Sequence, residues 1–424
     1  MLQHLPNLRN LDLSHSKNLI KMPHFGEFPN LERLDLEGCI KLVQLDPSIA
    51  LLTKLVYLNL KDCKSIISLL SNKPRPLNIR ASPSSTTTSS SLKRNMLPNH
   101  SSFSTSTTRT NLFSSLHSLR ELNLSFCNLL QIPNAIGCLY WLEALNLGGN
   151  NFVTVPSLRE LSKLVYLSLE HCKLLKSLPV LPSPTAIKHD LCKNNVPAFE
   201  TSWSIGLFIF NCPKLGETER WSSMTFSWMM QFIQANPQFS NDSSDRVQIV
   251  TPGSEMPSWF NNQSKDNLIR IDSSPIMHDN NNNIVGCVCC VVFSMTPRSH
   301  PTMRRISPSR HTYLGLEFTD THGRVIDKSN TNIQVTLNER LITAKSNHIW
   351  LTYFPLDLSS DLLSRTLWVD TGRYENDLKI EVKNCGYRWV YKRDLQEFNL
   401  TKMNHRNSLG GKLKSLAIED EAQQ

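Results

Sequence analysis

The sequence lacks the features that would place it at once among membrane, secreted or disulfide-rich proteins. No stretch approaches the roughly 18 uninterrupted apolar residues that a transmembrane helix needs. The opening residues, MLQHLPNLRNLDL, lack the basic start, the continuous apolar stretch and the small-residue cleavage site of a signal peptide. The 11 cysteines of the 424-residue chain are an odd number, which does not suit a disulfide framework. We therefore expect a cytoplasmic or nuclear protein without a membrane partner.

The short motifs of common enzymes are also missing. The chain contains no phosphate-binding G-x-x-x-x-G-K-[ST], no G-x-G-x-x-G, no H-E-x-x-H and no G-x-S-x-G. The asparagines 280–283 lack the ligand spacing and the terminal glutamate of a calcium loop. The net charge of +9 is small for this length, and the arginine-rich loop 296–311 has no interleaved aromatic residues. We therefore expect no enzymatic activity, no metal or cofactor, and no nucleic-acid partner.

What the chain does contain is a repeated pattern of leucines. Leu-x-x-Leu-x-Leu occurs six times and recurs every 22 to 24 residues within each block, starting at Leu8, Leu31, Leu55, Leu119, Leu142 and Leu164. This period lies in the leucine-rich-repeat range of roughly 20–29 residues. Each Leu-x-Leu predicts a short strand whose leucines point into a solenoid, while the residue between them faces the concave surface.

A second periodic position comes after each predicted strand. Three residues after the last leucine of each pattern stand Ser16, Cys39, Cys63, Cys127, Asn150 and Cys172. We expect a small side chain here that hydrogen-bonds the neighbouring turn. The four cysteines are therefore predicted to be structural, rather than metal ligands or nucleophiles.

The rhythm is interrupted once. The segment 71–115 is rich in serine and threonine and carries too little apolar surface to offset the entropy of ordering it. The sequence therefore predicts repeat blocks at 1–70 and 116–212, separated by a disordered insertion at 71–115.

The repeats fade into a segment, 213–245, that we expect to cap the solenoid and to link it to the C-terminal region of the chain. Within it, Glu219–Ala235 predicts an amphipathic helix. The apolar stripe of this helix consists of Trp221, Met224, Trp228 and Phe232.

From residue 246 the pattern changes to short apolar runs between polar turns. Nine runs predict strands at 246–250, 267–271, 284–294, 313–318, 332–337, 348–354, 366–369, 378–382 and 387–391. With no helix signal between them, they predict an antiparallel β-sandwich over 246–398, followed by a flexible tail at 399–424. Cys287, Cys289 and Cys290 are expected to be buried strand residues, because a zinc site would need a second ligand pair.

These patterns together resemble one known family. The register Leu-x-x-Leu-x-x-Leu-x-Leu-x-x-Cys, FNCPKL at 210–215 and IVTPGSEMPSWFNNQ at 249–263 are similar to the C-terminal half of plant TIR-type nucleotide-binding leucine-rich-repeat disease-resistance receptors, legume-like versions most of all. HIWLTYFPL at 348–356 and VKNCGYRWVYKRDLQEF at 382–398 look like the closing strands of the C-terminal jelly-roll/Ig-like domain of that family. The resemblance thus implies an α/β leucine-rich-repeat solenoid followed by an all-β antiparallel sandwich.

By this resemblance, the chain is the sensor half of an intracellular immune receptor that recognises a pathogen effector protein. In the family a nucleotide-binding domain switches and a TIR domain cleaves NAD. Neither domain is present in this sequence, so these activities are not carried over, although such domains of the same or another receptor are expected partners.

The residues expected to contact an effector lie between or beside the repeat leucines. They are Arg9, Asp12, Arg33, Asp35, Asn59, Lys61, Asn123, Asn146, Ser168 and Glu170. Asparagine and aspartate at these positions are equally suited to hydrogen-bonding neighbouring strands. The resemblance also marks a signature loop of the β-sandwich, formed by Pro252, Gly253, Ser254, Glu255, Pro257, Trp259 and Phe260. Within this loop, Trp259 and Phe260 are expected to pack the domain rather than to touch a ligand.

Two alternative functions remain open from the sequence. The pattern starts inside a repeat at Met1, which is consistent with a truncated decoy or adaptor that pairs with a full-length receptor. Jelly-roll folds also occur in lectins, so a glycan-binding β-sandwich is the other alternative.

Overall fold

The computed structural model describes residues 5–66, 112–186, 205–215, 219–236, 247–272, 275, 283–297, 312–319, 325–327, 332–335, 345–355, 366–370 and 378–396. The expected insertion at 71–115 lies outside these residues except for its last four, which form helix α1 (Leu112–Ser115). Phe113 of this helix is buried in the repeat core, so the second repeat block already starts there. The expected tail at 399–424 and the loop residues 298–311 also lie outside the described residues.

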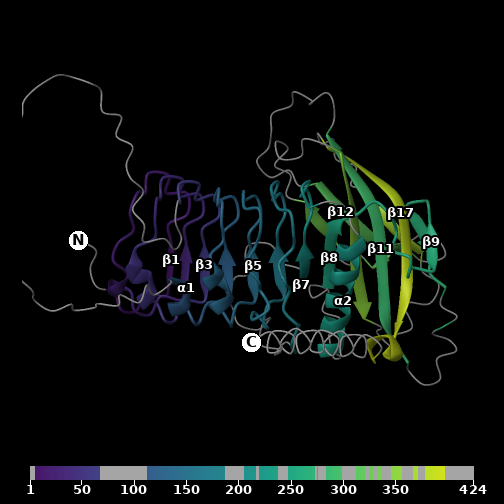
Figure 1. Ribbon diagram of the computed structural model, residues 1–424, viewed down its shortest axis with the longest axis horizontal. Coiled ribbons are helices and arrows are strands. Elements are labelled where there is room, and N and C mark those ends of the chain that lie inside the picture. Colours follow the sequence, from purple (N-terminus) through teal and green to yellow (C-terminus); the bar gives the residue numbers. More distant parts are fainter. Residues whose placement is uncertain are drawn as a thin grey trace, which may run out of the picture.

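Seven short parallel strands form the solenoid (Figure 1). The six predicted ones are β1 (Asn10–Asp12), β2 (Arg33–Asp35), β3 (Tyr57–Asn59), β4 (Glu121–Asn123), β5 (Ala144–Asn146) and β6 (Tyr166–Ser168). They pair in sequence order, with the central leucines Leu11, Leu34, Leu58, Leu122, Leu145 and Leu167 in register. A seventh strand, β7 (Ile205–Phe208), continues the row, although its sequence lacks the leucine pattern. The leucine-rich-repeat prediction is therefore confirmed.

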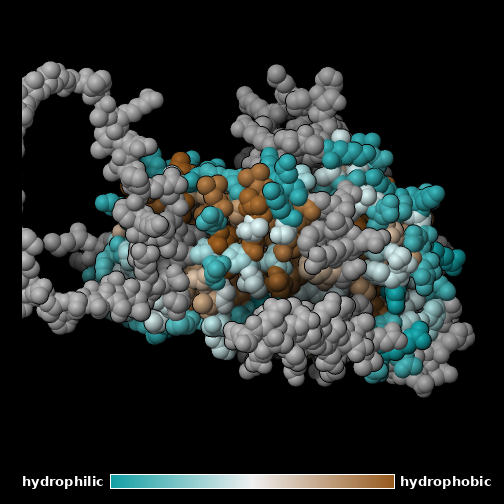
Figure 2. All heavy atoms as spheres, viewed as in Figure 1, coloured by the Kyte–Doolittle hydropathy of each residue, from teal (hydrophilic) through white to brown (hydrophobic). Residues whose placement is uncertain are grey.

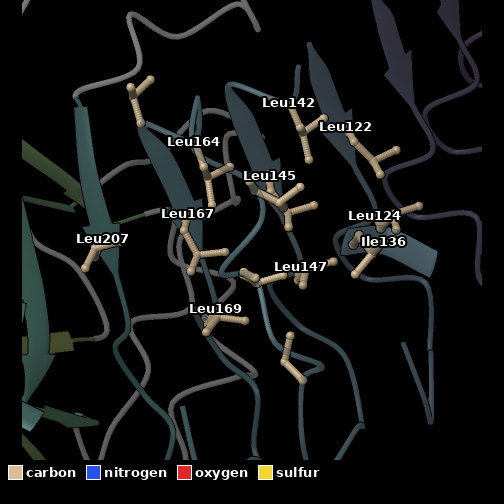
Figure 3. Close-up of a cluster of buried hydrophobic side chains, with 14 of the residues drawn as sticks. Leu122, Leu124, Ile136, Leu142, Leu145, Leu147, Leu164, Leu167, Leu169 and Leu207 are labelled. Atoms are coloured by element: carbon tan, nitrogen blue, oxygen red, sulfur yellow. The ribbon is translucent and has the colours of Figure 1, made fainter. Parts of the chain in front are cut away.

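The core of the solenoid is built from stacked leucines. Figure 3 shows side chains of successive strands, such as Leu122, Leu145 and Leu167, lying side by side from strand to strand. These three are fully buried, as are Leu124, Leu147 and Leu169 in the next row. Three 3-10 helices, η1 (Phe25–Glu27), η2 (Pro47–Leu51) and η3 (Asn134–Cys138), return the chain between strands. Burial of a leucine side chain stabilises a fold by about 1.5–3 kcal/mol, so the repeated pattern is sufficient to drive this stacking.

The periodic cysteines form a hydrogen-bonded ladder, as expected. The Sγ of Cys63 donates to the carbonyl oxygen of Leu36 at 3.1 Å, and that of Cys127 donates to Leu60 at 2.9 Å. Asn150 fills the same position, and its Nδ2 donates to the carbonyl of Leu124 at 2.8 Å. Cys212 adds a further step beyond the predicted ones, donating to Leu169 at 3.1 Å. All these cysteines are free and buried, and burial raises the pKa of Cys63 to about 12.

The C-terminal strands continue the sheet of the repeats. Strand β8 (Val247–Pro252) pairs in parallel with β7 and antiparallel with β15 (Ser346–Pro355). The sheet then runs through β11 (Ile284–Pro297), β17 (Leu378–Tyr391) and β9 (Asn262–Ser264), giving one mixed sheet of 12 strands. The expected β-sandwich separate from the solenoid is thus not confirmed. The pairing of β7 with β8 could not be predicted from the sequence, because helix α2 separates the two strands and they share no motif.

A second sheet of five strands belongs to the C-terminal part. It consists of β10 (Leu268–Arg270), β16 (Thr366–Asp370), β12 (Thr312–Thr319), β13 (Val325–Asp327) and β14 (Asn332–Val335). Leu316 and Val369 of this sheet share one buried cluster with Val291 and Trp350 of the large sheet. Cys287, Cys289 and Cys290 are buried in β11, as predicted. The predicted strands 378–382 and 387–391 are one strand, because β17 continues through a register shift opposite Val292 and Phe293.

Helix α2 (Glu219–Ala235) has the predicted bounds. On its stripe, Trp228 and Phe232 are buried and Met224 is half-buried. The buried side chains of the helix belong to the same hydrophobic cluster as the repeat leucines, although the edge of β7 itself is covered by β8. It packs beside β8 where the repeats meet the C-terminal strands (Figure 1).

Gly206 is predicted to be essential for this join. Its φ of 152° is rarely adopted by L side chains, and a Cβ atom here would overlap the carbonyl oxygen of Gln248 in β8. Gly206→Ala should lower the free energy of unfolding by about 1–3 kcal/mol or more. Urea unfolding measures this loss. The control is Gly137→Ala, whose Cβ would meet only the Ser157 carbonyl at 3.6 Å. Equal stability of the two variants would contradict the prediction.

Candidate protein-binding surface

The strands of the repeats share one face, which we call the concave face, and several of its residues are buried, Asn59, Asn123 and Ala144 among them. It has three rows of side chains, the first two set by the strand register and the third by the two-residue alternation of a strand. The first row is Asn10, Arg33, Tyr57, Glu121, Ala144 and Tyr166. The second is Asp12, Asp35, Asn59, Asn123, Asn146 and Ser168. The third is Ser14, Glu37, Lys61, Ser125, Gly148 and Glu170.

Every member of the second row makes the same local hydrogen bond. A side-chain oxygen of each residue accepts from the backbone N–H two residues further on, at 2.8 Å in Asp12, 2.9 Å in Asp35 and 3.0 Å in Asn146. The distances are 3.1 Å in Asn59, 3.0 Å in Asn123 and 3.5 Å in Ser168. Such turns end a strand, which explains why aspartate, asparagine and serine stand between the leucines. The main role of these six predicted contact residues is therefore structural, since each side chain ends its strand with a hydrogen bond to the backbone.

The first strands join their polar groups into a network. Nδ2 of Asn59 donates to Oδ1 of Asp35 at 3.1 Å and to Oε2 of Glu37 at 3.2 Å. Lys61 Nζ pairs with Glu37 Oε1 at 2.8 Å, and the Arg33 guanidinium lies 3.8 Å from the centroid of the Tyr57 ring. The predicted residues Arg33, Asp35, Asn59 and Lys61 are thus brought together.

Arg9, in contrast, does not lie in the three rows. It precedes β1 and pairs with Glu32, one repeat on, at 3.2 Å, with 70% of its side chain exposed. An exposed pair of this kind contributes about 0–1 kcal/mol. Its inclusion among the contact residues is therefore not supported by the register of the strands.

Three carboxyl groups on or beside the concave face have raised pKa values. Burial raises the pKa of Glu121 to about 7, against the attraction of Arg33, and that of Glu143 to about 6, against the attraction of Arg120. Burial alone raises the pKa of Glu170 to about 8. Glu121 and Glu143 were not among the expected contact residues, although Glu121 stands in the same row as Arg33, which was.

The signature loop joins the C-terminal strands to helix α2. The Trp259 ring stacks on Phe226 of α2 with centroids 3.7 Å apart, and Phe260 is buried beside it. Arg388 of β17 donates to the Trp259 carbonyl oxygen at 3.1 Å. The expectation that Trp259 and Phe260 pack the domain is confirmed.

The other loop residues divide by exposure. Pro252 ends β8 and is buried, as is Gly253, whose N–H donates to the Asn347 carbonyl at 3.2 Å. Pro257 accepts from the Phe260 N–H at 3.0 Å and is half-buried, as is Ser254, whereas Glu255 is exposed. The loop is therefore mainly a packing element, and Glu255 is its outward-facing member.

Sequence reasoning missed a polar chain across the join. Asn211, just after β7, contacts His171 through Nδ2 and Nδ1 at 2.7 Å. Its backbone N–H donates to Nε2 of His348 in β15 at 3.0 Å. Burial and the neighbouring His171 lower the pKa of His348 to about 3, so it is a neutral acceptor. These three residues are far apart in sequence, and no motif could have brought them together.

The buried turn at Asn123 is predicted to matter for stability. Asn123→Ala would leave the buried Ser125 N–H without its 3.0 Å acceptor, which costs about 1–3 kcal/mol. Asp12→Ala removes the equivalent bond at the exposed β1 and should cost well under half as much. Urea unfolding of both variants measures the difference. Equal losses of unfolding free energy would show that burial does not determine the cost of removing the hydrogen bond.

Stability should also depend on pH through Glu170. Its pKa is about 8 in the folded chain against an ordinary value of 4.5, so between these values the unfolded chain ionises first. Glu170 therefore destabilises the folded state progressively as the pH rises through this window. Relative to the wild type, Glu170→Gln should gain on the order of 2 kcal/mol between about pH 5 and about pH 8. Glu160→Gln, an exposed control, should show the wild-type profile, and an unchanged Glu170→Gln profile would contradict the assignment.

Two family models match the chain. Residues 251–396 match the C-JID domain, and residues 118–139 match the leucine-rich repeat. The C-JID match starts within β8 and ends after β17, so it covers the five-stranded sheet and the C-terminal strands of the large sheet apart from the first residues of β8. Neither model is a catalytic domain. No helix in the described part of the chain is both long and apolar enough to cross a membrane.

Related sequences are plant disease resistance proteins. The chain is 32% identical over 186 residues to disease resistance protein RPP2A of Arabidopsis thaliana, which covers 42% of this chain and 10% of that protein. It is 32% identical over 194 residues to disease resistance-like protein DSC1 of the same plant, covering 42% and 16%. TMV resistance protein N of Nicotiana glutinosa is 26% identical over 389 residues, covering 64% and 33%. The alignments thus span a third or less of each of these relatives.

The combination of repeats and C-JID domain carries the family resemblance. Strands β1 to β7 have the repeat register, and residues 251–396 have the C-JID pattern. The resemblance inferred from the sequence is confirmed: the chain is similar to the C-terminal, leucine-rich-repeat and C-JID part of plant TIR-type nucleotide-binding leucine-rich-repeat disease resistance proteins.

Proposed function

We propose that this chain is the recognition part of a cytoplasmic plant immune receptor and binds a pathogen effector protein through its concave face and its C-JID domain. The observation that carries the proposal is the match of a C-JID domain directly continuous with leucine-rich repeats in a chain related to disease resistance proteins. The chain itself catalyses no reaction. Its partners are the effector and the nucleotide-binding and TIR domains of the same or another receptor.

The surface of the repeats suits a protein partner. All but one of the exposed large hydrophobic side chains in the described residues lie in the repeats, the exception being Leu268. Figure 2 shows hydrophobic residues gathered over the repeats, while the C-terminal part is mainly hydrophilic in this view. Trp141 and Tyr140 are 54% and 55% exposed, and aromatic residues of this kind are enriched at interfaces.

The concave face adds rigidity to this surface. Its polar groups are already held by strand-ending turns and by the Asp35–Asn59–Glu37 network, so a partner orders few side chains when it binds. Low ordering cost favours affinity. The glycan alternative is less favoured, because Trp259 of the signature loop is stacked on Phe226 rather than presented to a sugar.

The proposal is tested by joining the chain to the TIR and nucleotide-binding domains of the related N protein. The fusion is expressed in leaves with a panel of effectors, and cell death is scored together with direct binding to the purified chain. At least one effector should bind and trigger death. Lys61→Glu, which reverses a charge on the concave face, should abolish both responses to it.

Lys41→Glu is the matched control. Lys41 is exposed outside the three rows and contacts Asn18 at 2.9 Å, so this variant should retain both responses. The proposal is contradicted if no effector in the panel binds or triggers death, or if Lys61→Glu and Lys41→Glu behave alike with each responding effector.

A further inference from the structure

The exposed aromatic pair Tyr140 and Trp141 lies in a row of turns that precede the repeat strands. Two positions of each turn recur five and four residues before the central leucine of the strand. In five successive repeats they are Pro29, Asn30, Thr53, Lys54, His117, Ser118, Tyr140, Trp141, Ser162 and Lys163. Neighbouring turns are linked, as by the bond from Ser118 Oγ to the carbonyl oxygen of Thr53 at 2.6 Å. We call this row the strand-start edge.

The strand-start edge is apolar at its centre and basic on either side. Tyr140 and Trp141 are each more than half exposed, so both present aromatic surface to the solvent. Lys163 belongs to the next repeat, and Lys54 lies two repeats earlier. None of the ten positions carries a carboxylate. The edge therefore suits a segment that combines apolar with acidic side chains.

The C-terminal part of the chain leaves the large sheet on the same side. Strand β8 is parallel to β7, and three antiparallel pairings follow, β8 with β15, β15 with β11 and β11 with β17. After three reversals β17 runs opposite to the repeat strands, so its last residue, Tyr391, lies on the side where those strands begin. The structure describes the chain from there as far as Gln396.

The sequence beyond Gln396 contains a segment, residues 409–421, that complements this edge. Three leucines and an aspartate in it follow one another at intervals of four, three and four residues, the spacing that places side chains on one face of a helix. They are Leu409, Leu413, Leu416 and Asp420. Residues 419–421, Glu-Asp-Glu, are the only consecutive acidic residues in a chain with a net charge of +9. We call residues 409–421 the terminal segment.

The length of chain between β17 and the terminal segment suits this edge. Trp141 precedes β5, which is six strand positions from β17 in the large sheet, roughly 29 Å by standard strand spacing. The 17 residues from Gln396 to Leu413 span from roughly 26 Å as a helix to roughly 56 Å when extended. The leucines can therefore reach Trp141, and Asp420 then lies further along the edge, toward Lys54.

We propose that the terminal segment docks on the strand-start edge of its own chain as a short amphipathic helix, with its leucines on Tyr140 and Trp141 and its acidic residues toward Lys54. Burial of apolar surface drives the contact, and the covalent connection keeps the segment at a high local concentration. The inference goes beyond the proposed function, which concerns the concave face and the C-JID domain. A partner protein that uses the aromatic pair has to displace the segment.

Hydrogen exchange of the full chain tests the docking. The backbone amides of the terminal segment should exchange at least about tenfold more slowly in the wild type than in Trp141→Ala, because exchange waits until the segment leaves the edge. Leu130→Ala, the control, removes an exposed apolar side chain beyond the other end of the strands and should keep the wild-type protection. Urea unfolding establishes that each variant is folded. Fast exchange of these amides in the wild type, or equal loss of protection in both variants, overturns the inference.

Two lysines give a matched test of the charge complementarity. Lys54 and Lys41 are both exposed, and each hydrogen-bonds an asparagine of the preceding repeat, Asn30 at 2.6 Å and Asn18 at 2.9 Å. Only Lys54 lies on the strand-start edge. Lys54→Glu should reduce the protection of the terminal segment at least about twofold, the scale of an exposed ion pair, whereas Lys41→Glu should leave it unchanged. Equal effects of the two substitutions contradict the docking.

Dilution separates docking within one chain from docking between two copies. The protection should stay constant over about a hundredfold dilution, since only contacts between copies follow mass action. Protection that is lost on dilution assigns the edge to a second copy and overturns the inference. A terminal segment that exchanges freely at every concentration leaves the aromatic pair to a partner protein, which also overturns the inference but does not affect the proposal of effector recognition.

Discussion

The pairing of β7 with β8 is the contact on which the arrangement of the whole chain depends. Six repeat strands could stack on leucines alone, but the C-terminal strands are fixed to them because β8 pairs with β7 on one side and with β15 on the other. This close approach requires the absence of a side chain at Gly206. The lack of a Cβ atom at Gly206 therefore permits the strand pairing that joins the repeats to the C-terminal strands.

The polar residues of the repeats form hydrogen bonds with backbone groups of the solenoid, whether or not a partner is bound. The second row ends each strand with a side-chain-to-backbone bond, and the cysteine ladder, continued by Asn150 and Cys212, satisfies carbonyl groups of the preceding repeat. These bonds are made in nearly every repeat, so they carry little information about specificity. Under the proposed function, specificity is expected from residues that differ between repeats, such as Glu121, Tyr166 and Glu170 in the first and third rows.

The elements with a strong local period could be predicted from the sequence. Six repeat strands, the cysteine ladder and helix α2 are explained by leucine spacing, by the recurring cysteines and by the stripe of Trp228 and Phe232. The strand β7 was missed because Ser204 and Ile209 stand where the first and last leucines of the pattern would be. The join to β8 depends on partners about 40 residues apart. The raised pKa values of Glu121 and Glu170 could not be predicted, since burial is a property of the assembled sheet.

The chain of Asn211, His171 and His348 crosses this join as a line of buried hydrogen-bonding groups. Together with the continuous sheet, it holds the described repeat strands and C-terminal strands in one arrangement. A ligand that touches both parts at once would not have to freeze a relative motion of two domains, and its second contact would form at the effective concentration of a rigid body. Two weak contacts, one on each part, would then combine into a single tight one.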